Sequence, residues 1–467
     1  MNYQKIYTVM PRPLQTLMLN AYAFKIHLQR FGTKFEKLLD QFIENEYLPE
    51  TQLVDYQNNR LKLLVEHAYR TVPYYAEIMK EKKLKPEDIK TKQDLMRLPL
   101  LTREHIKENL HRLVSHKFRE RDLLMGHTSG TTGSPLEFYW DKNMCMVNNV
   151  ADWRQKVWSG LNYGENYAVL LGRMIVPPEQ EQPPFWRLNY IHSQLWLSSF
   201  HMSGKNLGHY VGKLKSFKPK VIEGYPSTVY ILAKYLEKTG TVLPLRAVLT
   251  SSETLYPFQR ELIEKIFECK VFDFYGLAER VLFATECERH EGHHVNLDYG
   301  IMEIVNDKGD LVKEGEMGWI VGTSLHNFGM PFIRYKTNDV TRLKVKKCSC
   351  GRTFPVMEDI TTKAEDIIVT KDGRYISPSV LTHPFKPLHS ITMSQIIQED
   401  LDNVVVKIVR SSAYDEKDSL RLISGLKARL GEEMKIRVEY VDSLGHTSSG
   451  KFKWVISKVP IGFNKVL

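Results

Sequence analysis

The sequence contains no long hydrophobic run and few cysteines. Among its 467 residues, no stretch approaches the roughly 18 apolar residues that a membrane-spanning helix needs. The first fifteen residues lack the apolar core of a secretory signal. The 5 cysteines are too few for a disulfide framework, and an odd number cannot all pair within one chain. We therefore expect a cytoplasmic protein in a reducing compartment.

Dense charge of one sign is also scarce, although the chain is basic overall. Lys and Arg total 65 against 55 Asp and Glu, which gives a net charge of +10 and favours approach to anions such as nucleotides or an anionic membrane face. The one short basic run, KEKKLK at 80–85, is followed at once by Pro-Glu-Asp and is typical of a solvated turn. We therefore expect no nucleic-acid partner. A hydrophobic content of 42% excludes a mainly disordered chain.

Internal repeats and Gly/Ser linkers are absent, and the elements alternate. Short β-rich runs at 167–171, 220–223, 245–250 and 271–275 are separated by helical patterns such as 227–238 and 257–267. This alternation predicts an α/β fold. The last hundred residues have their own signals, with strands at 403–409 and 435–441 around a helix at 418–430, and predict a small α+β domain. We expect a helical N-terminal extension (1–60), a large domain of several subdomains (61–364) and a small, mobile C-terminal domain (365–467).

The N-terminal extension contains an amphipathic helical pattern. Leu17, Ala21, Phe24 and Leu28 recur at helical spacing among basic residues. The pattern has two interpretations. One is a helix that lies on an anionic membrane surface, which implies peripheral membrane association. The other is an ordinary helix that packs on the core.

A segment rich in glycine and hydroxyl residues, TSGTTGSP at 128–135, is the most informative part of the chain. Glycine lets backbone N–H groups approach phosphate oxygens closely, and the hydroxyl groups add donors. The spacing is not that of a Walker loop, because two residues separate the glycines and Ser134 follows the second one. The candidate phosphate-binding residues are Thr128, Ser129, Gly130, Thr131, Thr132 and Gly133.

This segment resembles the phosphate loop of the adenylate-forming superfamily of acyl-CoA synthetases, nonribosomal adenylation domains and luciferases. Three further segments resemble superfamily elements in the right order: YGLAE at 275–279, RYKTND at 334–339 and TSSGK at 447–451. Four other segments are similar to phenylacetate–CoA ligases and their relatives in capsular-polysaccharide biosynthesis. They are TVPYYAEIMKEKKLKPEDIKTKQDLMRLPLLTREHI, PPFWRLN at 183–189, EGYPS at 223–227 and CSCGR at 348–352.

The resemblance implies a role for individual residues. Glu279 matches the carboxylate that coordinates Mg²⁺, Asp339 matches the ribose ligand, and Lys451 matches the catalytic lysine that stabilises the charge at the α-phosphate. Tyr275, with Gly276, matches the residues beside the adenine of ATP. At the hinge, Lys363 matches an arginine of the family and Glu365 the pivot of the mobile domain. Candidate residues for the carboxylate substrate, which would lie between the 222–227 segment and the 275–279 turn, are Tyr225, Ser251 and Arg173.

Three positions depart from the family pattern. Ser134 stands where the family often has lysine, so one cation on the phosphates is missing, and Lys142 or the C-terminal domain would have to replace it. Asn338 replaces the glycine before the ribose-binding aspartate, and Lys363 lacks the planar fork of arginine. These departures indicate either a specialised catalyst or a repurposed one.

Cysteine and histidine form a second constellation. In the phenylacetate–CoA ligase branch, a Cys and a His seven residues later are followed by Cys-x-Cys-Gly, and Cys287, His294, Cys348 and Cys350 match this pattern here. Such a soft ligand set suits a structural, tetrahedral Zn²⁺. His290 or His293 are alternative ligands, and reduced cysteines without metal are the alternative to the site as a whole.

The resemblance implies an ATP- and Mg²⁺-dependent ligase. It would join a small-molecule carboxylate to AMP with release of pyrophosphate, and then transfer the acyl group to coenzyme A or to an amine of a sugar-type acceptor in polysaccharide biosynthesis. Two alternatives remain: an adenylyltransferase that acts on a hydroxyl group, and a degenerate, non-catalytic member that serves as a membrane-associated scaffold. A homodimer is compatible with this reading, but the sequence does not define the oligomeric state.

Overall fold

The structure, a computed structural model, describes residues 7, 9–127, 136–177, 179–360, 368–376, 378–385, 387–388, 390–444 and 454–459, with only the backbone at 338, 375, 379 and 392. Its α-helices are α2 (Arg12–Arg30), α3 (Thr33–Asn45), α4 (Glu50–Thr71), α5 (Pro73–Glu81), α6 (Arg103–Glu108), α7 (Lys142–Trp158), α8 (Leu207–Phe217), α9 (Pro226–Lys238), α10 (Pro257–Phe267), α11 (Pro378–Leu381) and α12 (Glu416–Leu430). Its strands are β1 (Leu124–His127), β2 (Glu137–Trp140), β3 (Tyr167–Leu170), β4 (Trp186–Asn189), β5 (Gln194–Leu197), β6 (Val221–Gly224), β7 (Ala247–Ser251), β8 (Lys270–Gly276), β9 (Phe283–Glu286), β10 (His293–Val295), β11 (Gly300–Val305), β12 (Gly318–Ser324), β13 (Tyr335–Thr341), β14 (Val356–Met357), β15 (Ile368–Val369), β16 (Tyr375–Ile376), β17 (Ile391–Gln398), β18 (Asn403–Arg410), β19 (Lys435–Tyr440) and β20 (Val455–Ser457).

A nine-stranded sheet forms the centre of the large region. Its strand order is β14-β10-β9-β8-β7-β6-β3-β5-β4. The run β5-β3-β6-β7-β8 is parallel, and antiparallel strands extend it at both ends. The strands expected at 167–171, 220–223, 245–250 and 271–275 are β3, β6, β7 and β8, so the α/β prediction is confirmed.

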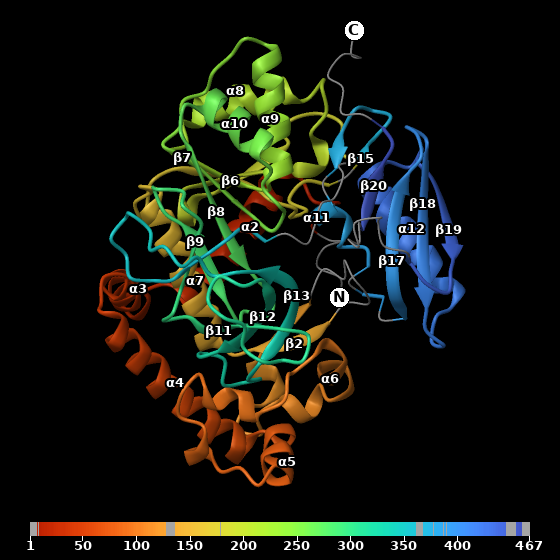
Figure 1. Ribbon diagram of the computed structural model, residues 1–467. Helices are drawn as coiled ribbons and strands as arrows, with labels where there is room; N and C mark the ends of the chain where they lie inside the picture. Colours follow the sequence, from red (N-terminus) through yellow and green to blue (C-terminus); the bar gives the residue numbers. More distant parts are fainter. Residues whose placement is uncertain are drawn as a thin grey trace.

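Helices cover this sheet and pack their apolar faces against it. Figure 1 shows α8, α9 and α10 grouped together at the top of the view. Helices α9 and α10 each begin with proline, whose fixed φ suits the first helical position, and they bury residues such as Ile231, Leu232 and Ile263. Helix α7 begins at Asp141, whose carboxylate accepts a hydrogen bond from the Met144 backbone N–H at 2.7 Å.

Other strands form smaller sheets that are separate from the central one. Strands β11, β12 and β13 form an antiparallel sheet, and β13 carries the RYKTND segment. Near the C-terminus, β19-β18-β17-β20 form a four-stranded sheet with α12, which lies at the right of Figure 1. Helix α12 has a capping box between Asp415 and Asp418. The predicted small α+β unit, with its strands and helix, is present.

The N-terminal helices pack on the large region, but not through the expected face. Helix α2 buries Gln15, Leu19 and Ala23. The residues of the apolar pattern lie outside: Leu17, Phe24 and Leu28 are 65%, 52% and 67% exposed. Helix α2 therefore packs on the large region, as one of the two interpretations expects, but Leu17, Phe24 and Leu28 lie on the side that faces away from it. The predicted boundary after residue 60 falls inside α4, which runs from Glu50 to Thr71.

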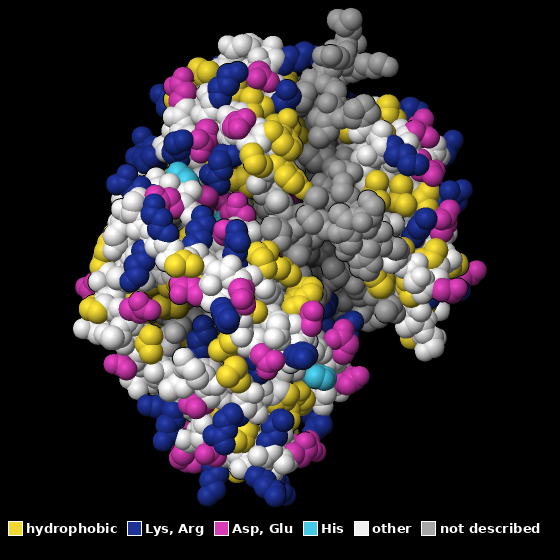
Figure 2. All heavy atoms as spheres, viewed as in Figure 1, with side chains coloured by type: hydrophobic (Ala, Val, Ile, Leu, Met, Phe, Trp, Pro, Cys, Tyr) yellow, Lys and Arg dark blue, Asp and Glu magenta, His cyan; other side chains and the backbone are white. Residues whose placement is uncertain are grey.

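The described part of the chain contains no helix that could span a membrane, and the face in Figure 2 has no uniform basic surface. None of its helices combines the length and apolar character that crossing a membrane requires. Figure 2 shows Lys and Arg side chains scattered over the visible face among Asp and Glu, with no continuous basic stripe on that face.

Candidate functional site

The candidate ATP-site residues converge where β8 ends beside β13. The Tyr275 hydroxyl, at the end of β8, donates a hydrogen bond to Asp339 Oδ2 at 2.9 Å. Burial, and next the negative charge of Asp339, raises the pKa of Tyr275 well above its usual value, so the hydroxyl stays a donor. Glu279 follows four residues later and is buried, with 6% of its surface exposed. Three residues that are separated by up to 64 positions in the sequence therefore share one site.

Two further residues hold Glu279, and sequence reasoning missed both. The Tyr335 hydroxyl donates to Glu279 Oε1 at 2.6 Å, and Arg103 Nη1, from α6, lies 3.8 Å from the same oxygen. The Glu279 carboxylate is therefore buried and held by partners from two distant segments. Tyr335 lies within the RYKTND segment, and Arg103 within the TREHI segment that carries part of the family resemblance, so the motifs contained the signal.

The candidate substrate residues lie on neighbouring strand ends of the central sheet. Tyr225 follows β6 and Ser251 ends β7, and these two strands pair in parallel. Burial raises the pKa of Tyr225 to about 12. Arg173 lies in the loop after β3, with its guanidinium 4.9 Å from the centre of the Trp196 ring. The carboxyl ends of adjacent parallel strands are the usual place for a ligand in such a sheet.

Several predicted site residues lie outside the described part of the chain. These are the phosphate loop with Thr128, Ser129, Gly130, Thr131, Thr132, Gly133 and Ser134, the hinge residues Lys363 and Glu365, and the catalytic candidate Lys451. Gly276 is described and ends β8 beside Tyr275.

The four predicted zinc ligands form one cluster. The ligand atoms of Cys287, His294, Cys348 and Cys350 all lie within 4.8 Å of one another. Cys287 Sγ is 3.6 Å from Cys348 Sγ, and Cys350 Sγ is 3.5 Å from His294 Nε2. Around a tetrahedral Zn²⁺ with its usual bond lengths, two sulfur ligands lie about 3.8 Å apart and a sulfur and a nitrogen about 3.6 Å. The arrangement therefore fits a zinc ion.

The surroundings orient His294 for this role. Its Nδ1 lies 3.2 Å from the Phe354 carbonyl oxygen, which fits donation from Nδ1 and leaves Nε2 to face Cys350. Burial lowers the pKa of His294 to about 4, so the imidazole is neutral at pH 7. The alternative ligands do not join the cluster. His293 faces Asp273 at 3.1 Å and Asp359 at 3.3 Å, and His290 lies 3.6 Å from Glu286.

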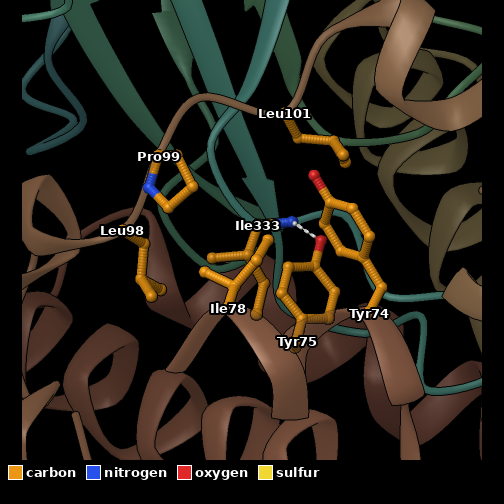
Figure 3. A pocket seen from close by; sticks show the side chains of 7 residues that line it. All are labelled: Tyr74, Tyr75, Ile78, Leu98, Pro99, Leu101 and Ile333. Atoms are coloured by element: carbon orange, nitrogen blue, oxygen red, sulfur yellow. Dashed lines mark hydrogen bonds between the residues drawn. The ribbon is translucent and has the colours of Figure 1, made fainter. Parts of the chain in front are cut away.

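A small hollow lies elsewhere, between α5 and the segment 98–101. Its lining residues are Tyr74, Tyr75, Ile78, Leu98, Pro99, Leu101 and Ile333, which Figure 3 shows around the hollow. The Tyr75 hydroxyl accepts a hydrogen bond from the Ile333 backbone N–H at 3.0 Å. No charged side chain lines it, so we do not assign it to a nucleotide.

The comparisons with known proteins agree with the fold and the motifs. A family model described as the CapK C-terminal domain matches residues 368–458. The protein CapK of Staphylococcus aureus is 26% identical over 98% of this chain and 100% of its own length. A phenylacetate–CoA ligase of Thermus thermophilus is 27% identical over 70% of this chain and 74% of its own.

Solved structures show the same fold. A 2-hydroxyisobutyryl-CoA ligase, solved with its acyl-AMP and coenzyme A, superposes with a TM-score of 0.61 at 19% identity, over 89% of this chain and 92% of that one. By sequence the chain is therefore similar to CapK and to the phenylacetate–CoA ligases, and its fold is that of a solved acyl-CoA ligase.

Proposed function

We propose that the protein activates a small-molecule carboxylate with ATP, forms an acyl-AMP and releases pyrophosphate. The observation that carries this proposal is the convergence of Tyr275, Asp339 and Glu279, three of the residues that the superfamily motifs assign to ATP and its metal ion. The phenylacetate–CoA ligases among the relatives support the same reaction class.

Each residue has a chemical task in this proposal. The Tyr275 hydroxyl orients the Asp339 carboxylate, which accepts hydrogen bonds from the ribose. Tyr335 and Arg103 orient Glu279, whose hard oxygens suit Mg²⁺. The loop 128–135 surrounds the phosphates, and Lys451 stabilises the charge that develops when the substrate carboxylate attacks the α-phosphate. Lys363 and Glu365 form the hinge by which the C-terminal domain moves between the two half-reactions.

We propose coenzyme A as the acceptor in the second half-reaction, with an amine of a sugar-type molecule as the alternative. The coenzyme A ligases among the relatives favour the first. The resemblance of the sequence segments to relatives in capsular-polysaccharide biosynthesis is the reason to consider the second. Incubation of the adenylated enzyme with coenzyme A or with amino sugars, followed by mass spectrometry, distinguishes a thioester from an amide.

ATP–pyrophosphate exchange with pooled carboxylic acids tests the first half-reaction. We expect exchange that depends on one acid pool and that Lys451→Ala abolishes, while ATP affinity stays close to that of the wild type, because the lysine acts on the transition state. Lys453→Ala is the matched control, since it removes a lysine two positions away. Equal losses in both variants would contradict the role of Lys451.

If the wild type neither exchanges pyrophosphate nor binds millimolar ATP, the scaffold alternative replaces this proposal. ATP binding and pyrophosphate release without a carboxylate would indicate transfer of AMP to a hydroxyl group.

We propose a structural Zn²⁺ at Cys287, His294, Cys348 and Cys350, which would tie the 287–294 segment to the turn at 348–350. The distances between the ligand atoms support it. The ion would contribute folding free energy, because all four ligands are protein side chains and no open position remains for chemistry.

We also propose that α2 binds an anionic membrane surface. Leu14, Leu17, Phe24 and Leu28 follow helical spacing and are all exposed. Helix α2 contains no acidic residue, and the first acidic residue of the chain is Glu36. An exposed apolar stripe among cations is typical of an interfacial helix.

Co-sedimentation with phosphatidylglycerol vesicles tests this surface. We expect binding that falls with added salt and that Leu17→Ser with Leu28→Ser reduces strongly. Leu420→Ser is the control, because Leu420 is also 67% exposed but lies on α12. Unchanged sedimentation of the double variant would contradict a role for α2.

A further inference from the structure

The loop that follows β3, residues 171–177, brings two groups to the candidate substrate residues, and we call it the substrate loop. It carries Arg173, and a Cβ at Gly172 would lie only 3.1 Å from the Tyr225 hydroxyl. Within the loop, the Ile175 backbone N–H donates to the Arg173 carbonyl oxygen at 3.0 Å. The position of this loop therefore sets where Arg173 lies relative to Tyr225.

Charges of both signs act on the space beside Tyr225. The Glu253 carboxylate accepts a hydrogen bond from the Ser227 backbone N–H at 3.1 Å. Burial raises the pKa of Tyr225, the negative charge of Glu253 raises it further, and the positive charge of Arg173 lowers it. A displacement of the substrate loop would therefore change both the shape and the charge that a carboxylate meets here.

Helix α2 packs against the outer side of the substrate loop. Leu19 of α2 forms one buried apolar cluster with Ile175 and Val176 of the loop, and Trp196 packs against this cluster. The guanidinium of Arg173 lies 4.9 Å from the centre of the same Trp196 ring. The N-terminal helix and the candidate substrate residue thus contact one shared side chain.

A hydrogen bond joins the N-terminal segment to the loop directly. The Tyr7 hydroxyl donates to the Ile175 carbonyl oxygen at 2.7 Å. Gln15 of α2 donates to the Tyr7 carbonyl oxygen at 3.2 Å and accepts a hydrogen bond from Arg187 Nε at 3.1 Å. Arg187 lies on β4, which pairs with the strand of Trp196, so the segment that holds the loop is itself fixed to the central sheet.

We propose that Tyr7 and Leu19 are positioning residues for the carboxylate substrate. They hold the substrate loop in the place where Arg173 and Gly172 face Tyr225, which reduces the ordering that substrate binding requires. The N-terminal segment is then part of the substrate site and not only a packed extension. This inference rests on the proposed function, because it assigns these residues to the substrate of that reaction.

ATP–pyrophosphate exchange with the acid that supports the reaction tests this inference. In Tyr7→Phe, we expect the KM of the carboxylate to rise about fivefold, because one hydrogen bond to the substrate loop is lost. Leu19→Ala should raise this KM at least as much, whereas Leu19→Met should stay close to the wild type because it keeps the volume of the cluster. In all three variants, kcat and the KM of ATP should change less than about twofold.

Tyr22→Phe is the matched control, because it removes the hydroxyl group of a tyrosine of α2 that is 58% exposed. A wild-type KM of the carboxylate in both Tyr7→Phe and Leu19→Ala would overturn the inference and leave the proposed function standing. Equal increases in the KM of ATP and of the acid would also overturn it, since α2 would then support the whole fold and not the substrate loop.

If no acid supports exchange in the wild type, the proposed function has failed, and hydrogen–deuterium exchange at residues 171–177 tests the inference separately. Faster exchange of these amides in Tyr7→Phe but not in Tyr22→Phe supports the positioning of the loop by the N-terminal segment, whatever ligand the loop serves. Equal exchange in the two variants overturns it.

Discussion

Several buried charges of the large region have a partner from a distant segment of the chain. Arg154 on α7 makes two hydrogen bonds to Asp298, at 2.8 and 3.0 Å, and both side chains are almost fully buried. Asn45, at the end of α3, donates to the same carboxylate at 3.1 Å. A buried ion pair of this kind adds little to the free energy of unfolding by itself, but the loss of one partner leaves a buried charge without compensation.

We therefore expect Asp298→Asn to lower the free energy of unfolding by about 3–5 kcal/mol. Urea denaturation followed by tryptophan fluorescence measures this loss. The matched control is Glu165→Gln, which removes the charge partner of the more exposed Arg246 and should lower the free energy of unfolding far less, because water screens this pair. Similar losses in both variants would show that the burial of the Asp298 pair does not matter.

His326 predicts a pH dependence of stability. Burial, and next the charge of Arg60, lowers its pKa to about 4, and its Nε2 lies 2.7 Å from the Asp298 carbonyl oxygen. Between pH 6.5 and 4, the unfolded chain therefore binds a proton at this residue that the folded protein does not bind, and stability falls as the pH falls. The loss amounts to about 2 kcal/mol between pH 6.5 and 5.

Urea midpoints of the wild type and of His326→Gln at pH 7, 6 and 5 isolate this effect. The variant is less stable at pH 7 because it loses contacts, but the difference from the wild type should shrink as the pH falls. A constant difference at all three pH values would exclude a contribution from His326.

At the scale of elements, side-chain contacts more than regular secondary structure hold the loops that contain Cys287, His294, Cys348 and Cys350. The only strands there are short, with β10 and β14 paired at two positions. Arg352 connects these loops to Glu46 at 2.8 Å and to Glu288 at 2.9 Å.

We expect purified protein to contain about one zinc per chain. Cys350→Ser should lower zinc affinity by at least about tenfold and reduce the melting temperature, because one of the four ligands is lost. Cys269→Ser is the control, since Cys269 lies outside the cluster. Elemental analysis and thermal unfolding with and without a chelator measure both effects, and a chelator that leaves the melting temperature unchanged would argue for plain thiols.

At the scale of the molecule, the N-terminal helices are part of the large region. Gln57 on α4 donates to the carbonyl oxygens of Leu297 and Gly300, both at 2.9 Å. Glu46 accepts hydrogen bonds from the Trp158 indole at 2.5 Å and from Arg352 at 2.8 Å. Removal of these helices would leave the Leu297 and Gly300 carbonyl oxygens without this donor, and Trp158 and Arg352 without this acceptor.

We expect a chain that begins at residue 61 to lose cooperative unfolding and near-ultraviolet circular dichroism. A chain that begins at residue 12 should keep both, because it retains α2, α3 and α4. If the chain that begins at residue 61 unfolds cooperatively with the wild-type midpoint, the first sixty residues are a separable extension after all.

The C-terminal unit also contacts the large region at a defined place. Arg374 Nη1 donates to the Phe200 carbonyl oxygen at 3.1 Å and to that of Arg429 at 2.8 Å. Val380 of α11 lies near Gly172, beside Tyr225. The small unit therefore lies against the same strand ends that carry the substrate candidates.

The sequence by itself determined the order of elements and the set of candidate residues. Period-two and helical patterns identified β3, β6, β7 and β8 with α9 and α10, since these elements bury regular apolar faces. The motifs identified Tyr275, Glu279, Asp339 and the metal-binding cluster, because each stands in a short and distinctive run of residues.

Only the tertiary structure decided which side chains meet. It placed Tyr335 and Arg103 on Glu279 and turned the apolar side of α2 outward. Periodicity identifies the faces of a helix but not the one that another element will cover, and the charges that meet come from segments far apart in the chain. The physical reason is that contact between distant residues depends on how the layers pack, and no local pattern records that packing.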